Sequence, residues 1–282
     1  MDAKQRITTF SRSGLTFDVT DAGPLDGEPV VLLHGFPADR TCWHRVESLL
    51  HSAGLRTLAP DQRGYSPGAR PAGRTAYRLE ELARDVLALA DAAGYDKVHL
   101  VGHDWGGAVA WLVAGNWPER VASLTVLSTP HPGALSRALR TVDQLRRSWY
   151  MAAFQLPFLP ERVLAARFRA ALGGSGLPAD DLERYAVRFR SAEALAGPIG
   201  WYRAMPLSRL RAHRVRVPTT YVWGAKDFAL GRHAAELTAE HVVGLYEFVE
   251  LAAGHWLPET RPDECAAAII ARTGAGNTGE PG

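Results

Sequence analysis

The stretch Gly102-His103-Asp104-Trp105-Gly106-Gly107 decides how this chain folds. An apolar, β-branched run at 97–101 precedes it, and a run of helix formers at 108–114 follows it. This order predicts a buried strand, a sharp turn and a helix. Glycines flank Asp104 because a side chain beside it would clash where the strand reverses into the helix. We therefore expect the turn to raise the Asp104 side chain clear of the sheet, at the positive end of the helix dipole.

An aspartate at this turn favours a particular kind of chemistry. The serine version of the pattern, G-x-S-x-G, is a nucleophile elbow whose hydroxyl needs a base, whereas an ionised carboxylate needs none. A carboxylate that attacked an ester would form a reactive anhydride, but attack on a saturated carbon forms an ordinary ester that water can cleave. Asp104 therefore indicates displacement at an sp³ carbon of an epoxide or alkyl halide. The alternative is an ordinary acidic residue in the first turn of a helix.

Length and composition limit the class of protein. The 282 residues suffice for one large α/β domain with an insertion, and 46% hydrophobic and 22% charged residues are ordinary for a globular protein. The net charge of +2 suggests neither nucleic acid nor membrane as a partner. We expect Cys42 and Cys265 to be separate thiols. The start of the chain lacks the apolar region of a signal peptide. The sequence also contains no run of about 18 apolar residues that would predict a membrane-spanning helix, so we expect a cytoplasmic enzyme.

Alternating strand-like and helix-like segments predict an α/β fold with a mostly parallel sheet. A weakly alternating stretch at 7–20 predicts a β-hairpin at the sheet edge. Further strands are expected at 30–33, 55–59, 97–101, 121–127, 219–223 and 245–251, and helices at 41–51, 79–93, 108–114, 233–241 and 262–272.

The alternation stops after residue 133. The next segment is helix-like, rich in arginine and broken by proline and glycine, which indicates an inserted helical cap. The predicted units are a first part of the core at 1–133, a cap at 134–214, a second part of the core at 215–272 and a flexible tail at 273–282.

An acid and a histidine follow the last two predicted strands. Asp227 comes just after the strand at 219–223, and His255 follows the strand at 245–251. Strand ends line the ligand crevice of an open α/β sheet, and the order nucleophile, acid, histidine is that of hydrolases built on this layout. His255 would take a proton from a water that attacks the ester on Asp104, and Asp227 would hold the imidazole. The alternative is an unrelated Asp and His in surface loops.

Ester hydrolysis passes through an oxyanion, which needs two hydrogen-bond donors. The backbone N–H of Trp105, the residue after the nucleophile, is one expected donor. The second is the backbone N–H of Phe36, in the sequence His34-Gly35-Phe36-Pro37 at the end of a predicted strand. The alternative is a simple turn, whose Phe36–Pro37 bond could be cis.

Two tyrosines of the cap, Tyr150 and Tyr202, are candidate acids. By themselves they are typical of amphipathic packing residues. If the substrate is an epoxide, a catalytic role becomes the better interpretation. The alkoxide formed on ring opening needs a proton, and a phenol is protonated at neutral pH and can donate one.

With these residues the chain resembles the epoxide hydrolases of the α/β-hydrolase fold, including the epoxide hydrolase domain of soluble epoxide hydrolases. The likeness extends over 30–271. The resemblance implies Asp104 as nucleophile, His255 with Asp227 as the water-activating pair, and Tyr150 with Tyr202 as ring-opening acids. The segments that match are H-G-F-P, D-x-R-G-Y, G-H-D-W-G-G, A-K-D-F and G-H-W in the core, and W-Y-x-x-x-F-Q and G-P-x-x-W-Y-R-x-M in the cap.

Dehalogenases on the same scaffold are the main alternative. Haloalkane dehalogenases tend to carry Asn where this chain has Phe36, and many place their acid after the strand that ends near Ser128. Fluoroacetate dehalogenases tend to carry Arg where this chain has Trp105. We therefore predict an epoxide hydrolase that forms a vicinal diol through a covalent ester. A haloalkane or haloacid dehalogenase, or a non-catalytic ligand-binding protein of this fold, are the other candidates.

The expected substrates are water and a small lipophilic epoxide, with no nucleic acid and no membrane insertion. No H-E-x-x-H motif or Cys/His cluster predicts a metal, and we expect no cofactor. Apolar aromatic side chains favour a lipophilic pocket, and the predicted lining is Trp105, Trp149, Phe154, Trp201 and Phe228.

Overall fold

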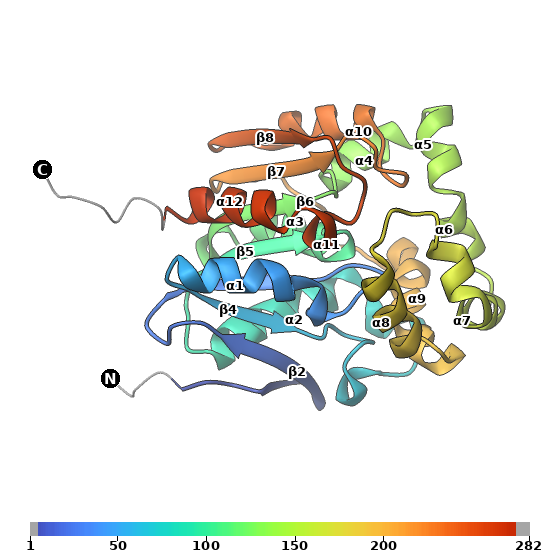
Figure 1. Cartoon of the computed structure of the whole chain (residues 1–282), viewed down its shortest axis with the longest axis horizontal. Helices are drawn as coiled ribbons and strands as arrows, with labels where there is room; N and C mark the ends of the chain where they lie inside the picture. The colour runs from blue at the N-terminus through green and yellow to red at the C-terminus, as the bar shows by residue number, and fades with distance from the viewer. Residues whose placement is uncertain (1–4, 275–282) are drawn as a thin grey trace, which may run out of the picture.

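The structure, a computed structural model that describes residues 5–274, contains one eight-stranded sheet with helices on both faces (Figure 1). The strands follow the spatial order β1-β2-β4-β3-β5-β6-β7-β8. From β4 to β8 along this order, neighbouring strands are parallel, whereas β2 is antiparallel to β1 and β4. The strands are β1 (Thr9–Arg12), β2 (Leu15–Ala22), β3 (Glu28–Leu33), β4 (Leu55–Pro60), β5 (Val98–His103), β6 (Val121–Leu127), β7 (Thr219–Gly224) and β8 (Tyr246–Leu251).

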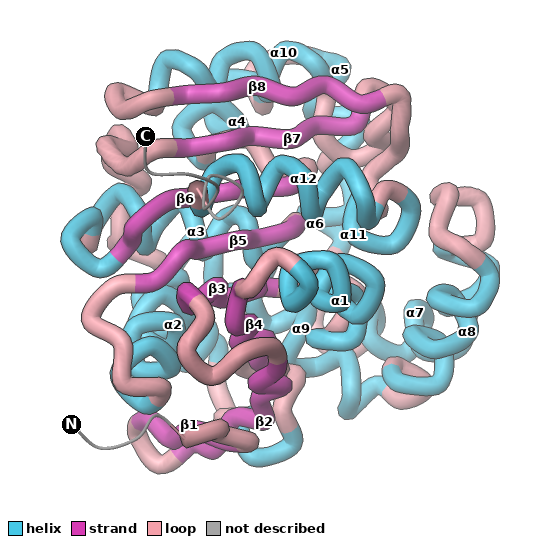
Figure 2. The backbone as a smooth tube through the Cα atoms, turned by 60° about the vertical axis from the view of Figure 1, so that its left-hand side comes forward, coloured by secondary structure: helices cyan, strands magenta, loops and turns pink. Residues whose placement is uncertain are grey.

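Burial explains why the central strands read as continuous apolar runs. Nearly every residue of β3, β4, β6 and β7 is buried, because helices cover both faces of a parallel sheet. The β1–β2 hairpin lies at one edge of the sheet, and the partly exposed β8 forms the other (Figure 2). The predicted hairpin, strands and mostly parallel sheet are confirmed.

Helices α1 and α12 cover one face of the sheet, and α2 and α3 cover the other (Figure 1). The predicted helices at 41–51 and 233–241 each combine an α-helix with a 3₁₀ turn. The α-helices of the core are α1 (His44–Ser52), α2 (Leu79–Ala92), α3 (Trp105–Asn116), α4 (Pro132–Ala138), α10 (Arg232–Leu237), α11 (Leu257–Thr260) and α12 (Pro262–Thr273). The 3₁₀ helices are η1 (Arg40–Trp43), η2 (Pro67–Ala69), η3 (Arg74–Tyr77), η4 (Pro118–Arg120), η5 (Met205–Leu207) and η6 (Thr238–His241).

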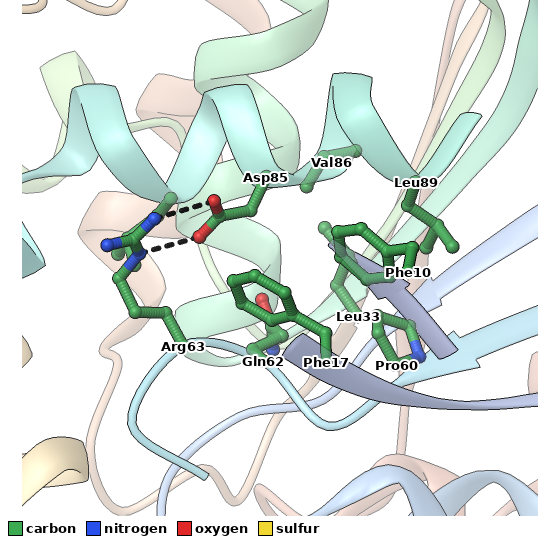
Figure 3. Close-up of a pocket in the computed structure, with 10 residues that line it drawn as sticks. Phe10, Phe17, Leu33, Pro60, Gln62, Arg63, Asp85, Val86 and Leu89 are labelled. Carbon is green, nitrogen blue, oxygen red and sulfur yellow. Dashed lines mark hydrogen bonds and ion pairs between the residues drawn. The ribbon is translucent and has the colours of Figure 1, made fainter. Parts of the chain in front are cut away.

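A buried ion pair fastens the loop after β4 to α2. The Arg63 guanidinium donates from two nitrogens to the two oxygens of Asp85, each at 2.7 Å, and Arg12 of β1 donates to the same carboxylate at 2.8 Å. Figure 3 shows the Arg63–Asp85 pair beside the apolar side chains of Phe10 and Phe17. Charges buried among such neighbours need well-aligned partners, so this network fixes the D-x-R-G-Y loop against the hairpin.

The cap helices lie together at the end of the sheet where the parallel strands finish (Figure 1). They are α5 (Val142–Arg147), α6 (Trp149–Ala153), α7 (Leu159–Leu172), α8 (Ala179–Arg188) and α9 (Ala192–Ala204). No strand occurs between 134 and 214, as predicted. Most of helix α4 falls inside this range, but the helix packs against α10, and the His131 N–H just before it donates to Thr238 Oγ1 at 3.1 Å. We therefore propose that the cap begins at α5.

Three further expectations concern the chain as a whole. Cys42 and Cys265 are both buried and neither forms a disulfide, as predicted. Within residues 5–274 no helix is long and apolar enough to cross a membrane. Most of the tail predicted at 273–282 lies outside the described residues, because the description ends at Gly274.

Candidate active site

Asp104 lies at the turn between β5 and α3, with a φ of 50° and a ψ of −122°. The flanking glycines allow this turn: a Cβ on Gly102 would lie 2.4 Å from the Gly106 carbonyl oxygen, and one on Gly106 would lie 2.2 Å from that of Leu33. A positive φ at a non-glycine residue is strained and is often found at functional sites. The predicted elbow is therefore present, with Asp104 immediately before the first residue of α3.

The two oxygens of the Asp104 carboxylate have different surroundings. The backbone N–H of Phe36 donates to Oδ1 at 2.7 Å, whereas Oδ2 lies 3.5 Å from His255 Nε2. Burial opposes ionisation, but hydrogen bonding and positive charge from His255, with the Phe36 N–H, hold the pKa of Asp104 below its ordinary value. The Phe36–Pro37 bond is cis. One oxygen is thus bound by the loop after β3 and the other faces His255, while the Trp105 N–H as second donor stays a prediction.

His255 lies between two carboxylates. Its Nδ1–H donates to Asp227 Oδ2 at 2.8 Å, and the other oxygen of Asp227 accepts from the N–H groups of Ala229 and Leu230. Burial alone would lower the pKa of His255, but the charges and hydrogen bonds of Asp227 and Asp104 raise it to about 10. In the free protein the ring is therefore an imidazolium, and Asp227 fixes its orientation.

His103, which was not among the site residues predicted from the sequence, helps to hold the loop that carries His255. Its Nε2 donates to the His255 carbonyl at 2.9 Å, and Ser128 Oγ donates to the same oxygen at 2.7 Å. Burial and the positive charge of His255 lower the pKa of His103 to about 4, so it is neutral. The elbow sequence contains His103, so the sequence did place this residue next to Asp104. Its hydrogen bond could not be predicted, because the partner, His255, lies far along the chain.

The two cap tyrosines meet over the elbow. Tyr150 comes from α6 and Tyr202 from α9, with their ring centroids 5.9 Å apart. Tyr202 packs edge-on against Phe36 at 5.3 Å and Trp105 at 4.9 Å. Burial and the negative charge of Asp104 raise the pKa of both phenols. Both are therefore protonated and able to donate at neutral pH.

One cavity of about 970 Å³ connects these groups. Asp104 and His255 line it from the core, and Tyr150 and Tyr202 line it from the cap. Among the aromatic residues expected in the lining, the structure places Trp149, Phe154 and Phe228 around this cavity. The lining residues that it did not predict include Trp256, Leu159, Val163, Leu164 and Arg167.

The prediction that Trp201 lines the pocket is wrong. Its side chain is 1% exposed, and its indole N–H donates to the Arg63 carbonyl at 2.8 Å. Adjacent residues of a helix point about 100° apart, so Tyr202 faces the cavity and Trp201 faces the core. Trp105, also predicted, packs edge-on between these two rings and is not part of the lining.

Comparison with known proteins agrees with this geometry. The α/β hydrolase fold family matches residues 28–262. The AB hydrolase superfamily protein YfhM of Bacillus subtilis (strain 168) is 35% identical over 265 residues, which cover 89% of this chain and 91% of that protein. Epoxide hydrolase 4 of Homo sapiens is 36% identical over 267 residues, covering 89% and 74%.

The crystal structure of Epoxide Hydrolase A from Mycobacterium thermoresistibile superposes with a TM-score of 0.80 at 28% identity, covering 93% of this chain and 96% of that one. The chain therefore belongs to the epoxide hydrolases of the α/β hydrolase fold family.

Proposed function

We propose that the protein hydrolyses a lipophilic epoxide to a vicinal diol through a covalent ester on Asp104. One observation carries this proposal. A single cavity presents a carboxylate oxygen and a histidine on its core side and two protonated phenols on its cap side. A nucleophile facing two donors suits a three-membered ring whose carbon is attacked while its oxygen is protonated.

In the first step Asp104 Oδ2 attacks an epoxide carbon and the carbon–oxygen bond of the ring breaks. The electron pair stays on the oxygen, which takes a proton from one phenol while the other phenol donates a hydrogen bond. The product is a hydroxyalkyl ester of Asp104. Forming the ester removes one of the two negative charges beside His255, so its pKa falls and its proton passes through solvent to the phenolate.

In the second step neutral His255 takes a proton from water, and the oxygen of that water attacks the carbonyl carbon of the ester. The Phe36 N–H, already bonded to Oδ1 at 2.7 Å, stabilises the oxyanion that develops there. The bond between this carbon and Oδ2 breaks, and the new carboxyl group gives its proton to the departing diol. Asp104 is again a carboxylate and His255 an imidazolium, as at the start.

The variant His255→Gln tests this order of events. It should form the ester but hydrolyse it very slowly, because the base acts only in the second step. Mass spectrometry after mixing with an epoxide should show protein plus the full substrate mass, and Asp104→Ala should show no adduct. A His255→Gln protein that turns over normally, or an adduct on Asp104→Ala, would contradict the proposal.

The two cysteines bear on where the enzyme acts. Both cysteines are free and buried, which fits a reducing compartment, and we propose that the enzyme acts in the cytoplasm.

A further inference from the structure

The small net charge of the whole chain is the sum of a positively charged cap and a negatively charged core. The cap from the start of α5, residues 142–214, contains 12 arginines and six acidic residues, a net charge of +6. Because the whole chain carries +2, the remainder carries −4. The cap is therefore a strongly cationic layer on an anionic core, and such a field attracts anionic surfaces to one side of the molecule.

The mouth of the cavity is apolar and exposed. Five large apolar side chains both line the cavity and are between 45% and 69% exposed, so they form its outer edge. We call these five residues the rim: Trp149, Leu156, Leu159, Val163 and Phe228. Single exposed apolar side chains are common on protein surfaces, whereas a cluster of them around one opening indicates an interaction surface.

Phe158 extends this apolar surface beyond the cavity. Its ring is 74% exposed, and its backbone has a φ of 59°, which is unfavourable for a bulky side chain. The residue lies next to rim residue Leu159, at the start of α7, and does not line the cavity. An exposed phenylalanine in an unfavourable backbone conformation buries little apolar surface within the chain, so its ring is available for contact with another apolar surface.

Unpaired positive charge surrounds the rim. Arg146 of α5 and Arg167 of α7 are exposed and line the cavity, and Arg162 is exposed on α7. None of the three has an ion-pair or hydrogen-bond partner for its side chain among residues 5–274. The nearby acids are already paired: Asp143 bonds Arg147 and buried Glu161 bonds Arg203. The surface thus combines apolar side chains with uncompensated arginine.

We propose that the rim, Phe158 and these arginines dock the cap on the surface of an anionic lipid bilayer, with the cavity mouth toward the lipid. Aromatic and aliphatic side chains flanked by arginine are typical of surfaces that bind in the plane of a membrane interface. A second copy of the chain fits less well, because its cationic cap would face this one. The inference goes beyond the proposed function, and a lipophilic substrate could then enter directly from the bilayer.

The test is co-flotation of the protein with lipid vesicles. The wild type should bind vesicles that contain about one third phosphatidylglycerol, should bind pure phosphatidylcholine much more weakly, and should dissociate as salt rises. The variant Phe158→Ser/Arg162→Glu, whose residues lie outside the cavity lining, should partition at least about tenfold more weakly. Its activity on a water-soluble epoxide should stay unchanged.

A matched control makes the same chemical changes on the core. Leu245 is 68% exposed beside β8 and Arg216 is exposed, so Leu245→Ser/Arg216→Glu removes one apolar side chain and reverses one charge away from the cap. The control should bind anionic vesicles like the wild type.

Three results would overturn the proposal: no binding to anionic vesicles at low salt, equal losses in both double variants, or a wild-type dimer that only the cap variant dissociates. The readout does not involve turnover, so it stands apart from the test of the proposed function.

Discussion

Replacing Asp104 by asparagine should switch His255 from imidazolium to neutral imidazole near neutral pH. The asparagine side chain would keep the shape of the carboxylate and an oxygen for the Phe36 N–H, but it would carry no charge. It therefore imitates the electrostatic state of the ester, in which one carboxylate beside His255 has been neutralised. The hydrogen bond from His255 to Asp227 at 2.8 Å would remain.

The size of the effect follows from the geometry. Asp104 Oδ2 lies 3.5 Å from His255 Nε2, and both side chains are largely shielded from solvent. At an effective dielectric constant of about 20, opposite charges at this separation interact by on the order of 4 kcal/mol, or about a thousandfold in the protonation equilibrium. With the pKa of His255 raised to about 10 in the parent, the variant should lose its proton near neutral pH.

The measurement is a pH titration of histidine side chains labelled with ¹⁵N, followed by NMR. His255→Gln identifies the resonance of interest, and His99, bonded to Ser123 on the strands β5 and β6, serves as an internal control that should titrate alike in both proteins. If His255 stays protonated at the same pH in Asp104→Asn as in the parent, Asp104 does not control its charge. Ester formation could then not create the base for the second step.

Three further changes test other parts of the structure. Tyr150→Phe or Tyr202→Phe should each slow ester formation by about 10- to 1,000-fold and the double variant should nearly abolish it, with little effect on ester hydrolysis in rapid-mixing experiments. Burial raises the pKa of Glu259 to about 7, so ionisation of this side chain opposes folding as the pH rises from about 4.5 through 7. In urea unfolding, Glu259→Gln should therefore be more stable than the parent by about 3 kcal/mol at pH of about 8. At pH of about 4 the two proteins should be equally stable. Asp85→Leu should cost at least about 3 kcal/mol in the same assay because it leaves Arg63 buried without its carboxylate; an unchanged unfolding midpoint would contradict the importance of that pair.

Local patterns were sufficient to predict most of the fold. The elbow could be recognised because the apolar strand, the two glycines and the helix formers are contiguous at 97–114. The same holds for the hairpin and the parallel strands, whose alternation or continuous apolar character is set by burial on one or both faces. The positions of Asp227 and His255 followed from the rule that strand ends face the ligand crevice.

The sequence could not predict in which direction individual side chains of a helix point, nor which distant residues they contact. Trp201 and Tyr202 are equally aromatic neighbours, and only the rotation of α9 decides that Tyr202 reaches the cavity. The support of the His255 loop by His103 joins residues 152 positions apart. The overall charge of +2 concealed the cationic cap, because a sum over the chain discards where charges lie.

The two steps of the proposed reaction draw on different layers of the molecule. Asp104 and His255 sit at strand ends of the core, so ester hydrolysis uses groups with one rigid frame. Tyr150 and Tyr202 come from two cap helices, and the Gln155 side chain, just past α6, donates to the Tyr202 carbonyl at 2.8 Å, which holds the two phenols together. A displacement of the cap would therefore move both phenols as a pair relative to the nucleophile. It would change ring opening while leaving ester hydrolysis intact, so any force on the cap, including contact with a surface, would act on the first step alone.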